Sequence, residues 1–318
     1  MTIICSGSLA FDRLAAYKGL FKDLILPEKL DILNICFLVD NVERRFGGTV
    51  GNIAYNLVLL GEKPLVISSL GNDSDGRDYL SRLKSFNITL EGIRFDPENA
   101  TAGAYIATDN AYNQLIFFNP GAMQGATLYN LRNLANNPQE KLAIVSPGGF
   151  SDMLTLSKAY REMGIRFICD PGQQIPVFSA TELLEMLQGS LILMTNEYEL
   201  DLFLKKTSLT IEQLFRYTGT VITTFGESGS QVITPKGSQR IPPVEVKKAI
   251  NPTGAGDAYR AGVLKAIHQG QDLFTACRLG SVVAAFCVEA PGTQEHNFSL
   301  NEILERYATV YKGSINLE

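Results

Sequence analysis

A glycine-rich run, Asn251-Pro-Thr-Gly-Ala-Gly-Asp257, carries the strongest sign of chemistry in the sequence, and a helical pattern follows it through Ile267. Glycines let a ligand approach the backbone closely, and the first turn of a helix offers free N–H groups and the positive end of the helix dipole. Gly254, Ala255 and Gly256 therefore predict an anion hole for a phosphoryl group.

Asp257 falls in the first turn of this expected helix and faces the same space. A carboxylate there can accept the proton of an attacking hydroxyl group, so Asp257 is the candidate general base. The alternative is a plain strand-to-helix turn with an acidic residue at the start of the helix.

A second glycine-rich helix entry lies at Gly47-Gly48-Thr-Val-Gly51-Asn52. Glycines without side chains suit a closely packed, polyhydroxylated ligand, and Asn52 adds a polar group in the first turns of the helix. The alternative is that Gly-Gly-Thr only caps the helix.

Two more polar segments follow apolar strands, and ligands of doubly wound sheets bind beyond the carboxyl ends of strands. Asn196 and Glu199 lie three residues apart, so both could face one water-coordinated Mg²⁺, or they could only cap a helix. Thr223, Gly226 and Gly229 belong to a loop that could line a nucleotide pocket or be only a turn.

The elements that must position these segments alternate between strands and helices. Apolar strands are expected at 2–9, 65–70, 142–146, 167–170, 191–195 and 221–225, and helices at 48–60, 75–86, 152–163, 180–187, 198–206 and 211–217. This order predicts an α/β fold, a doubly wound and mainly parallel sheet flanked by helices on both faces.

Short alternating or aromatic strands at 93–95, 102–108 and 114–119 depart from this order. We expect a small β-sheet lid built from segments at about 13–45 and 92–120. Segments so far apart in sequence cannot form an independent domain, so residues 1–318 are expected to form a single domain.

Composition excludes several classes of protein. The chain has 318 residues, with 28 Lys+Arg against 33 Asp+Glu, and this acidic balance argues against a binder of nucleic acid or of membrane surfaces. We see no signal peptide and no apolar stretch long enough to span a bilayer. Five scattered cysteines without a CxxC pair indicate reduced thiols in a cytoplasmic protein, and two histidines exclude a zinc site built on several histidines.

Missing motifs narrow the reaction class. The sequence has no GxxxxGK[ST] and so is not a P-loop enzyme, and it lacks GxGxxG and GxSxG. Phosphoryl transfer by another fold is the strongest class that remains.

Taken together, these segments resemble the ribokinase (PfkB) family of carbohydrate and nucleoside kinases. Residues 47–52 resemble its first signature, 251–257 its second and Asn196–Glu199 its N-x-x-E motif, in an order that spans nearly the full chain. Further segments are similar to the ribokinase-like adenosine kinases of bacteria, namely 7–12, 26–28, 37–40, 119–123, 170–174 and 292–295.

The resemblance implies a kinase that uses ATP and Mg²⁺ to phosphorylate adenosine for purine salvage. Asp257 would take the proton from the ribose 5′-hydroxyl, and the backbone N–H groups of the anion hole would stabilise the transferred γ-phosphoryl group. Asn196 and Glu199 would organise Mg²⁺ through water. A monovalent cation is also implied, although Asn251 stands where the family usually has an acidic residue.

The resemblance further implies which residues bind the ligands. Those expected to bind the substrate are Ser8, Asp12, Gly47, Gly48, Asn52, Tyr105, Phe118, Gln173 and Gln174. Those expected to bind ATP are Asn196, Thr223, Gly226 and Gly229. Tyr105, Phe117 and Phe118 are the rings available to stack on adenine, and strand alternation predicts that at least one of them packs in the core instead.

Three further interpretations stay open. The substrate could be a sugar, a sugar phosphate or another nucleoside such as inosine, and Arg13 and Arg45 could serve a sugar phosphate. The chain could also be a binding protein on a kinase-like scaffold that has lost catalysis, although the intact Asp257 argues against this. Finally, the strands at 102–108 and 114–119 could pair two copies through the lid, as a homodimer.

Overall fold

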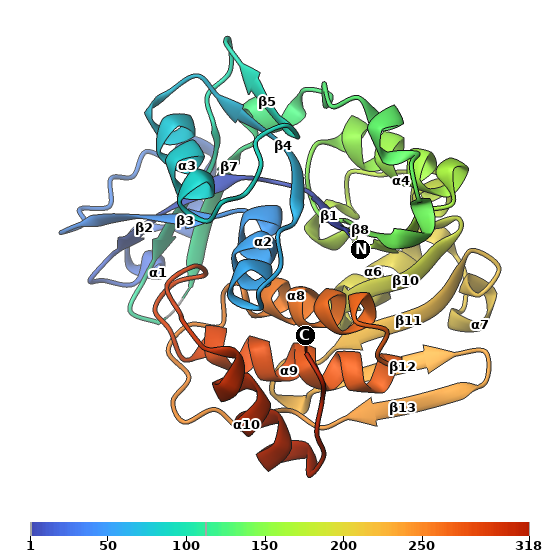
Figure 1. Cartoon of the computed structure of the whole chain (residues 1–318). Coiled ribbons are helices and arrows are strands. Elements are labelled where there is room, and N and C mark those ends of the chain that lie inside the picture. The colour runs from blue at the N-terminus through green and yellow to red at the C-terminus, as the bar shows by residue number, and fades with distance from the viewer. Residues whose placement is uncertain (1, 112, 318) are drawn as a thin grey trace.

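Residues 2–111 and 113–317 are described by a computed structural model, which contains two β-sheets (Figure 1). The large sheet has the strand order β13-β12-β11-β10-β9-β8-β1-β4-β5. Its strands are β1 (Thr2–Ser6), β4 (Leu65–Gly71), β5 (Ile93–Asp96), β8 (Lys141–Val145), β9 (Arg166–Cys169), β10 (Ser190–Asn196), β11 (Thr218–Thr224), β12 (Ser230–Thr234) and β13 (Gly237–Ile241). Neighbouring strands from β11 to β5 run parallel, while the β11–β12–β13 edge is antiparallel, so the expected mainly parallel sheet is confirmed.

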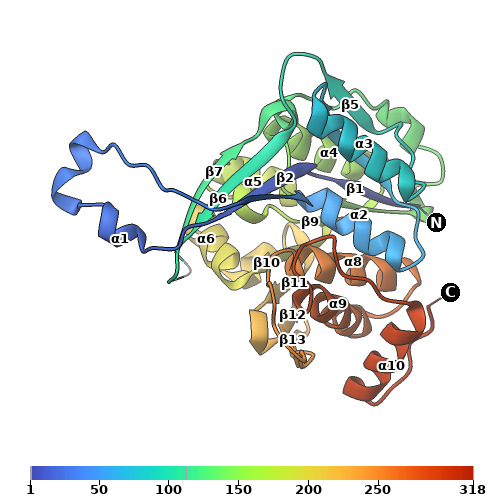
Figure 2. The same ribbon diagram turned by 90° about the vertical axis from the view of Figure 1, so that its left-hand side faces the viewer.

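Helices cover both faces of this sheet (Figures 1 and 2). One layer consists of α2 (Thr49–Leu59), α3 (Ser74–Ser85), α8 (Ala255–His268), α9 (Leu273–Val288) and α10 (Leu300–Tyr311). The other consists of α4 (Phe150–Met163), α5 (Ala180–Leu187), α6 (Glu197–Thr207) and α7 (Ile211–Leu214). In β1, Ile3 and Cys5 pack against the first layer and Ile4 packs against the second, because successive side chains of a strand point to opposite faces.

A separate sheet forms the lid, in the order β3-β2-β6-β7. Its strands are β2 (Ala10–Ala16), β3 (Val42–Gly47), β6 (Ala102–Thr108) and β7 (Gln114–Asn119). The chain passes from the large sheet into the lid through the short turn 7–9, so the lid stands at the carboxyl end of β1. The segment between β2 and β3, which carries α1 (Phe21–Leu24), projects away from the rest of the molecule (Figure 2).

The lid boundaries differ from the prediction in both segments. The first lid segment extends from Ala10 to Gly47 rather than over 13–45, because these residues pair with each other at the start of β2 and the end of β3. In the second segment, Ile93–Asp96 does not join the lid but forms β5 and pairs in parallel with β4. β5 follows α3, and a strand reached through a crossover helix returns to the same sheet.

Two helices of the same layer begin on glycines with positive φ. Gly48 (φ 83°) precedes α2 and Gly254 (φ 81°) precedes α8. A side chain on Gly48 would also meet the carbonyl oxygen of Ser8 at 2.4 Å, so glycine is required there for two reasons. Within 2–111 and 113–317, none of the helices is long and apolar enough to cross a membrane.

Candidate active site

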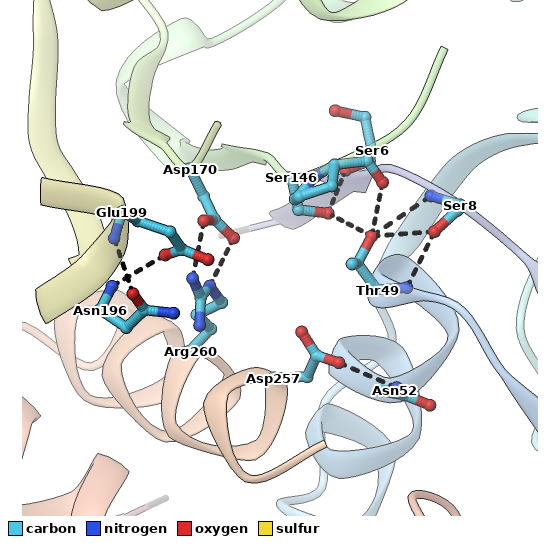
Figure 3. Close-up of polar contacts among 11 residues, drawn as sticks. Ser6, Ser8, Thr49, Asn52, Ser146, Asp170, Asn196, Glu199, Asp257 and Arg260 are labelled. Atoms are coloured by element: carbon cyan, nitrogen blue, oxygen red, sulfur yellow. Dashed lines mark hydrogen bonds and ion pairs between the residues drawn. The ribbon is translucent and has the colours of Figure 1, made fainter. Parts of the chain in front are cut away.

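Asp257, in the first turn of α8, faces Asn52 in the first turns of α2 (Figure 3). Asn52 Nδ2 donates a hydrogen bond to Asp257 Oδ2 at 2.8 Å, across 205 positions of sequence. Burial raises the pKa of Asp257 to about 7, while the charge of Arg260 and the hydrogen bond from Asn52 oppose that rise. A carboxylate that titrates near neutral pH is suited to take a proton from a hydroxyl group.

A polar cavity of about 460 Å³ lies over Asp257, between the lid and the start of α8. The predicted site residues that line it are Ser8, Asp12, Gly48, Asn52, Phe118, Gln173, Asn196, Glu199, Gly226, Gly254, Gly256 and Asp257. Burial raises the pKa of Asp12 to about 6. The structure thus brings together residues that the sequence scatters from the first strand to the eighth helix.

An apolar cavity of about 770 Å³ adjoins the polar one. Side chains from the loop after β13 and from α9 line it, among them Val244, Val246, Ala284, Ala285 and Val288, together with Gly229 and Ala255. Both cavities are lined by Thr224, Gly226 and Gly256, so they meet at the N-terminus of α8. One ligand could therefore extend from the apolar cavity to the helix end while a second fills the polar cavity.

The N-terminus of α8 differs in one respect from the predicted anion hole. The N–H group of Ala255 donates to the carbonyl oxygen of Pro252 at 3.1 Å. In the described part of the chain, the N–H groups of Gly254, Gly256 and Asp257 donate no hydrogen bond. The N–H groups of this helix end that are free to bind an anion are therefore those of Gly254, Gly256 and Asp257 rather than that of Ala255.

Thr49, which the sequence does not single out, ties the first glycine-rich entry to the residues that follow β1 and β8 (Figure 3). Its N–H donates to Ser8 Oγ at 3.0 Å, and its hydroxyl donates to the carbonyl oxygen of Pro147 at 2.7 Å. Ser146 Oγ also donates to the Thr49 hydroxyl at 3.1 Å. These contacts fix the position of Ser8 and of the first turn of α2 at the edge of the polar cavity.

Asp170 and Arg260 form a buried ion pair that the sequence interpretation missed (Figure 3). Arg260 Nη2 donates to Asp170 Oδ1 at 2.7 Å, and Nε donates to Asp170 Oδ2. Burial lowers the pKa of Arg260, but the charge and hydrogen bonds of Asp170, together with the charges of Asp257 and Glu199, raise it above its usual value. The one feature of the sequence that indicates a place for Arg260 at the site is its position three residues after Asp257, on the same face of the expected helix.

Asn196 and Glu199 bond to each other as a capping box at the start of α6. Asn196 N–H donates to Glu199 Oε2 and Glu199 N–H donates to Asn196 Oδ1, both at 2.8 Å. Burial raises the pKa of Glu199. Glu199 Oε1 takes no hydrogen bond in the described residues, so the capping role leaves one carboxylate oxygen at the polar cavity.

Four predicted ligand-binding residues line neither the polar nor the apolar cavity. Tyr105 points to the opposite face of the lid, where the Arg13 guanidinium lies 5.1 Å from its ring centre, because it follows the cavity-lining Ala104 on a strand. Gln174 donates to the carbonyl oxygen of Gly148, and Thr223 is buried against Thr195. The carbonyl oxygen of Gly47 accepts the Tyr79 hydroxyl at 2.7 Å.

Gln294 is a further residue that the sequence interpretation did not assign a role. Its Nε2 donates to Asn52 Oδ1 at 3.1 Å and to the Tyr79 hydroxyl oxygen at 2.9 Å. Because Asn52 Oδ1 is taken by Gln294, the amide nitrogen of Asn52 faces Asp257. The loop after α9 thus fixes the orientation of the group that contacts the candidate base.

Comparison with known proteins places these features in a family. Residues 23–299 match the pfkB family carbohydrate kinase profile. The chain belongs to this family. The family is one of kinases that transfer a phosphoryl group from ATP to an alcohol, and the ribokinase-like fold expected from the sequence is confirmed.

Relatives of similar length include proteins named nucleoside kinase. The chain is 31% identical over 279 residues to a nucleoside kinase of Methanocaldococcus jannaschii, covering 88% of this chain and 91% of that protein. The structure of a Burkholderia thailandensis nucleoside kinase in complex with inosine superposes with a TM-score of 0.85 at 33% identity, covering 98% of this chain and 99% of that one. The same B. thailandensis enzyme is also known in complex with ADP-inosine, with a TM-score of 0.83.

Proposed function

We propose that this kinase phosphorylates a purine nucleoside, transferring the γ-phosphoryl group of MgATP to the 5′-hydroxyl of adenosine to give AMP and ADP. The observation that carries the proposal is the meeting of two cavities at the N-terminus of α8, beside Asp257. The apolar cavity would hold the base and sugar of ATP. Its phosphates would then reach the free N–H groups of Gly256 and Asp257.

The polar cavity suits a nucleoside because it offers hydrogen-bonding side chains for the ribose and an aromatic ring for the base. Asp12 and Asn52 lie on its walls and can accept and donate hydrogen bonds to two neighbouring ribose hydroxyls. Phe118 and Gln173 line it as well, so a purine base can stack on the ring and bond to the amide. The likeness to an enzyme crystallised with inosine supports this assignment.

Asp257 would act as the general base. In its ionised form it takes the proton from the 5′-hydroxyl, whose oxygen then attacks the γ-phosphorus of ATP. The N–H groups of Gly254, Gly256 and Asp257 stabilise the charge on the transferring group, and the lid covers the cavity to exclude water.

The donor set fits a Mg²⁺ ion held mainly by the nucleotide. In the described residues, no cluster of three His, Cys, Asp or Glu side chains could hold a metal ion alone, and Mg²⁺ commonly keeps its waters and binds substrate phosphates. Glu199, with one free carboxylate oxygen at the cavity, would accept hydrogen bonds from metal-bound water. Bound Mg²⁺ would neutralise the phosphates. A monovalent cation near Asn251 stays a prediction. The Asn251 side chain is already hydrogen-bonded there, to the carbonyl oxygen of Pro291 and the N–H group of Thr253.

The main alternative is another acceptor of the same family, such as inosine, a sugar or a sugar phosphate. Arg13, which could serve a sugar phosphate, is bound to Asp75 on the far face of the lid. Arg45 contacts Glu43 and the carbonyl oxygen of Pro291. Both candidate phosphate ligands are therefore occupied, which favours an uncharged acceptor.

The test is ADP release from MgATP with adenosine, inosine, ribose, fructose and fructose 6-phosphate compared side by side, each product identified by mass. The proposal expects AMP from adenosine at the highest kcat/KM. A higher value for inosine would keep the nucleoside assignment and change the base. Turnover with sugars alone would overturn it.

Asp257→Asn tests the general base. We expect phosphorylation to fall by at least ~10³-fold, because the variant cannot accept the proton, while the calorimetric Kd of the nucleoside changes little. Undiminished turnover would refute the role of Asp257. Loss of binding together with loss of turnover would point instead to a collapsed site.

We also propose that the kinase works in purine salvage in the cytoplasm and pairs through its lid. Its five cysteines are free, as a reducing compartment requires. β7 is an edge strand of the lid and exposes Ile116 and Phe117. Light scattering after gel filtration should give twice the mass of one chain, and Ile116→Lys should reduce it to one.

A further inference from the structure

Arg260 is a charged residue of the site to which the proposed reaction assigns no role. It stands one helical turn after Asp257 on α8, so both side chains lie on the same face of the helix (Figure 3). The residue is 7% exposed and lines the polar cavity. A buried guanidinium needs compensating partners, and its contacts therefore indicate its function.

One edge of the Arg260 guanidinium is fully hydrogen-bonded to a carboxylate. Nε and Nη2 both donate to the carboxylate of Asp170, which follows β9 and is 1% exposed. A bidentate pair of this kind fixes the plane of the guanidinium as well as its position. Asp170 therefore aims the remaining nitrogen, Nη1, in one direction.

Nη1 is directed toward the N-terminus of α8. A Cβ atom built on Gly256 would lie 2.8 Å from Nη1, so the nitrogen is immediately beside that residue. Long side chains of a helix point back toward its N-terminus, which explains this approach. In the described part of the chain Nη1 donates no hydrogen bond, and it lies beside Gly256, whose own N–H group is also free.

The charges that line the polar cavity are strongly unbalanced. Its acidic side chains are Asp12, Asp170, Glu199 and Asp257, and among its described lining residues Arg260 is the one with a cationic side chain. A group carrying the negative charge of a phosphoryl oxygen would be repelled by this carboxylate wall unless a cation faced it.

We propose that Arg260 is a catalytic residue whose Nη1 binds the phosphoryl group during its transfer, with Asp170 as the residue that positions it. In this step the acceptor oxygen forms a bond to the γ-phosphorus and the bond from that phosphorus to the β–γ bridging oxygen breaks. The acceptor proton goes to Asp257, and ADP leaves. The inference rests on phosphoryl transfer in this cavity, not on which acceptor binds.

The first test compares Arg260→Gln with Arg260→Lys. We expect kcat at saturating substrates to fall at least ~100-fold in R260Q and at least ~10-fold in R260K, because lysine keeps a charge but not the fork held by Asp170. The loss should persist from pH 6 to 9, while the Kd of the acceptor changes less than about threefold.

The pH profile separates this role from an indirect one. Arg260, Asp170 and Asp12 are the charged groups that face Asp257. If Arg260 served only to keep Asp257 ionised, the activity of R260Q would recover at high pH, and that result would overturn the proposal.

A binding measurement tests the inference without turnover. The wild-type protein should bind a non-hydrolysable ATP analogue more tightly than ADP, and R260Q should reduce that preference by about tenfold or more. An unchanged preference would refute it. If none of the five acceptors reacts but the preference still falls, the proposed acceptor is wrong, while the contact between Arg260 and the phosphoryl group is supported.

A variant at an ion pair outside the two cavities is the control for the effects of losing an ion pair on folding. Arg94→Gln breaks an ion pair to Asp96 on β5, with an Nη2–Oδ2 distance of 2.8 Å, and should leave kcat and the nucleotide preference unchanged. Should R260Q not fold, the double variant D170N/R260Q removes both buried charges and carries the same expectation, with wild-type values counting against the proposal.

Discussion

Asp257 has a raised pKa, and the hydrogen bond that it accepts from Asn52 opposes that rise. Its pKa is about 7, so kcat/KM should rise about tenfold per pH unit below 7 and level off above it, as the ionised base becomes populated. Asn52→Leu removes the hydrogen bond that lowers this pKa, and the acidic limb should move to higher pH. The pH dependence of kcat/KM between 5.5 and 9 measures both. A limb that stayed in place or moved to lower pH in N52L would contradict the assignment.

Gln294 acts on the same base through Asn52. In Gln294→Leu the amide of Asn52 loses the donor that fixes its orientation, so its nitrogen faces Asp257 for only part of the time. We expect kcat to fall about tenfold and the acidic limb to move in the same direction as in N52L. Gln271→Leu is the matched control, because Gln271 bonds to the carbonyl oxygen of Asn316 away from the cavities. A wild-type pH profile in Q294L would rule out this positioning role.

At the scale of elements, β7 presents neighbouring rings to opposite faces of the lid. Phe118 lines the polar cavity, whereas Phe117 pairs with Tyr105 on the other face. Phe118→Ala should raise the KM of a nucleoside 10- to 100-fold with a smaller effect on kcat, since stacking on a base contributes about 1–3 kcal/mol. Phe117→Ala, the control in the same strand, should change KM less than twofold. Equal effects of the two variants would show that the lid does not stack on the substrate.

At the scale of the molecule, the two cavities can be separated by their ligands. ADP at 100 times its Kd should stabilise the protein by about 2.7 kcal/mol, and a nucleoside should stabilise it independently. Ala284→Phe places a ring in the apolar cavity and should abolish the shift of Tm with ADP while keeping the shift with nucleoside. Differential scanning fluorimetry gives both. If A284F abolished the nucleoside shift too, the assignment of ligands to cavities would be wrong.

The lid shows where sequence patterns stop being sufficient. Alternation along 102–108 and 114–119 separates Ala104 from Tyr105 and Phe117 from Phe118, but it does not say which face meets the cavity. That choice depends on α3, whose Tyr79 packs against Phe11 on the other face of the lid. The prediction placed β5 in the lid for a similar reason. A strand of four residues is too short for its sequence to indicate which of two sheets it joins.

Sequence patterns are enough to predict the parallel α/β architecture, the two glycine-rich helix entries and the candidate base. These depend on local rules: the period of apolar residues, the conformational freedom of glycine and the free N–H groups of a first helical turn. Three features are visible only in the folded protein: Asp170 aims Arg260, Gln294 orients Asn52, and two cavities meet at Gly256. These contacts join residues 90 and 242 positions apart, or form where three layers meet, and no local pattern records them.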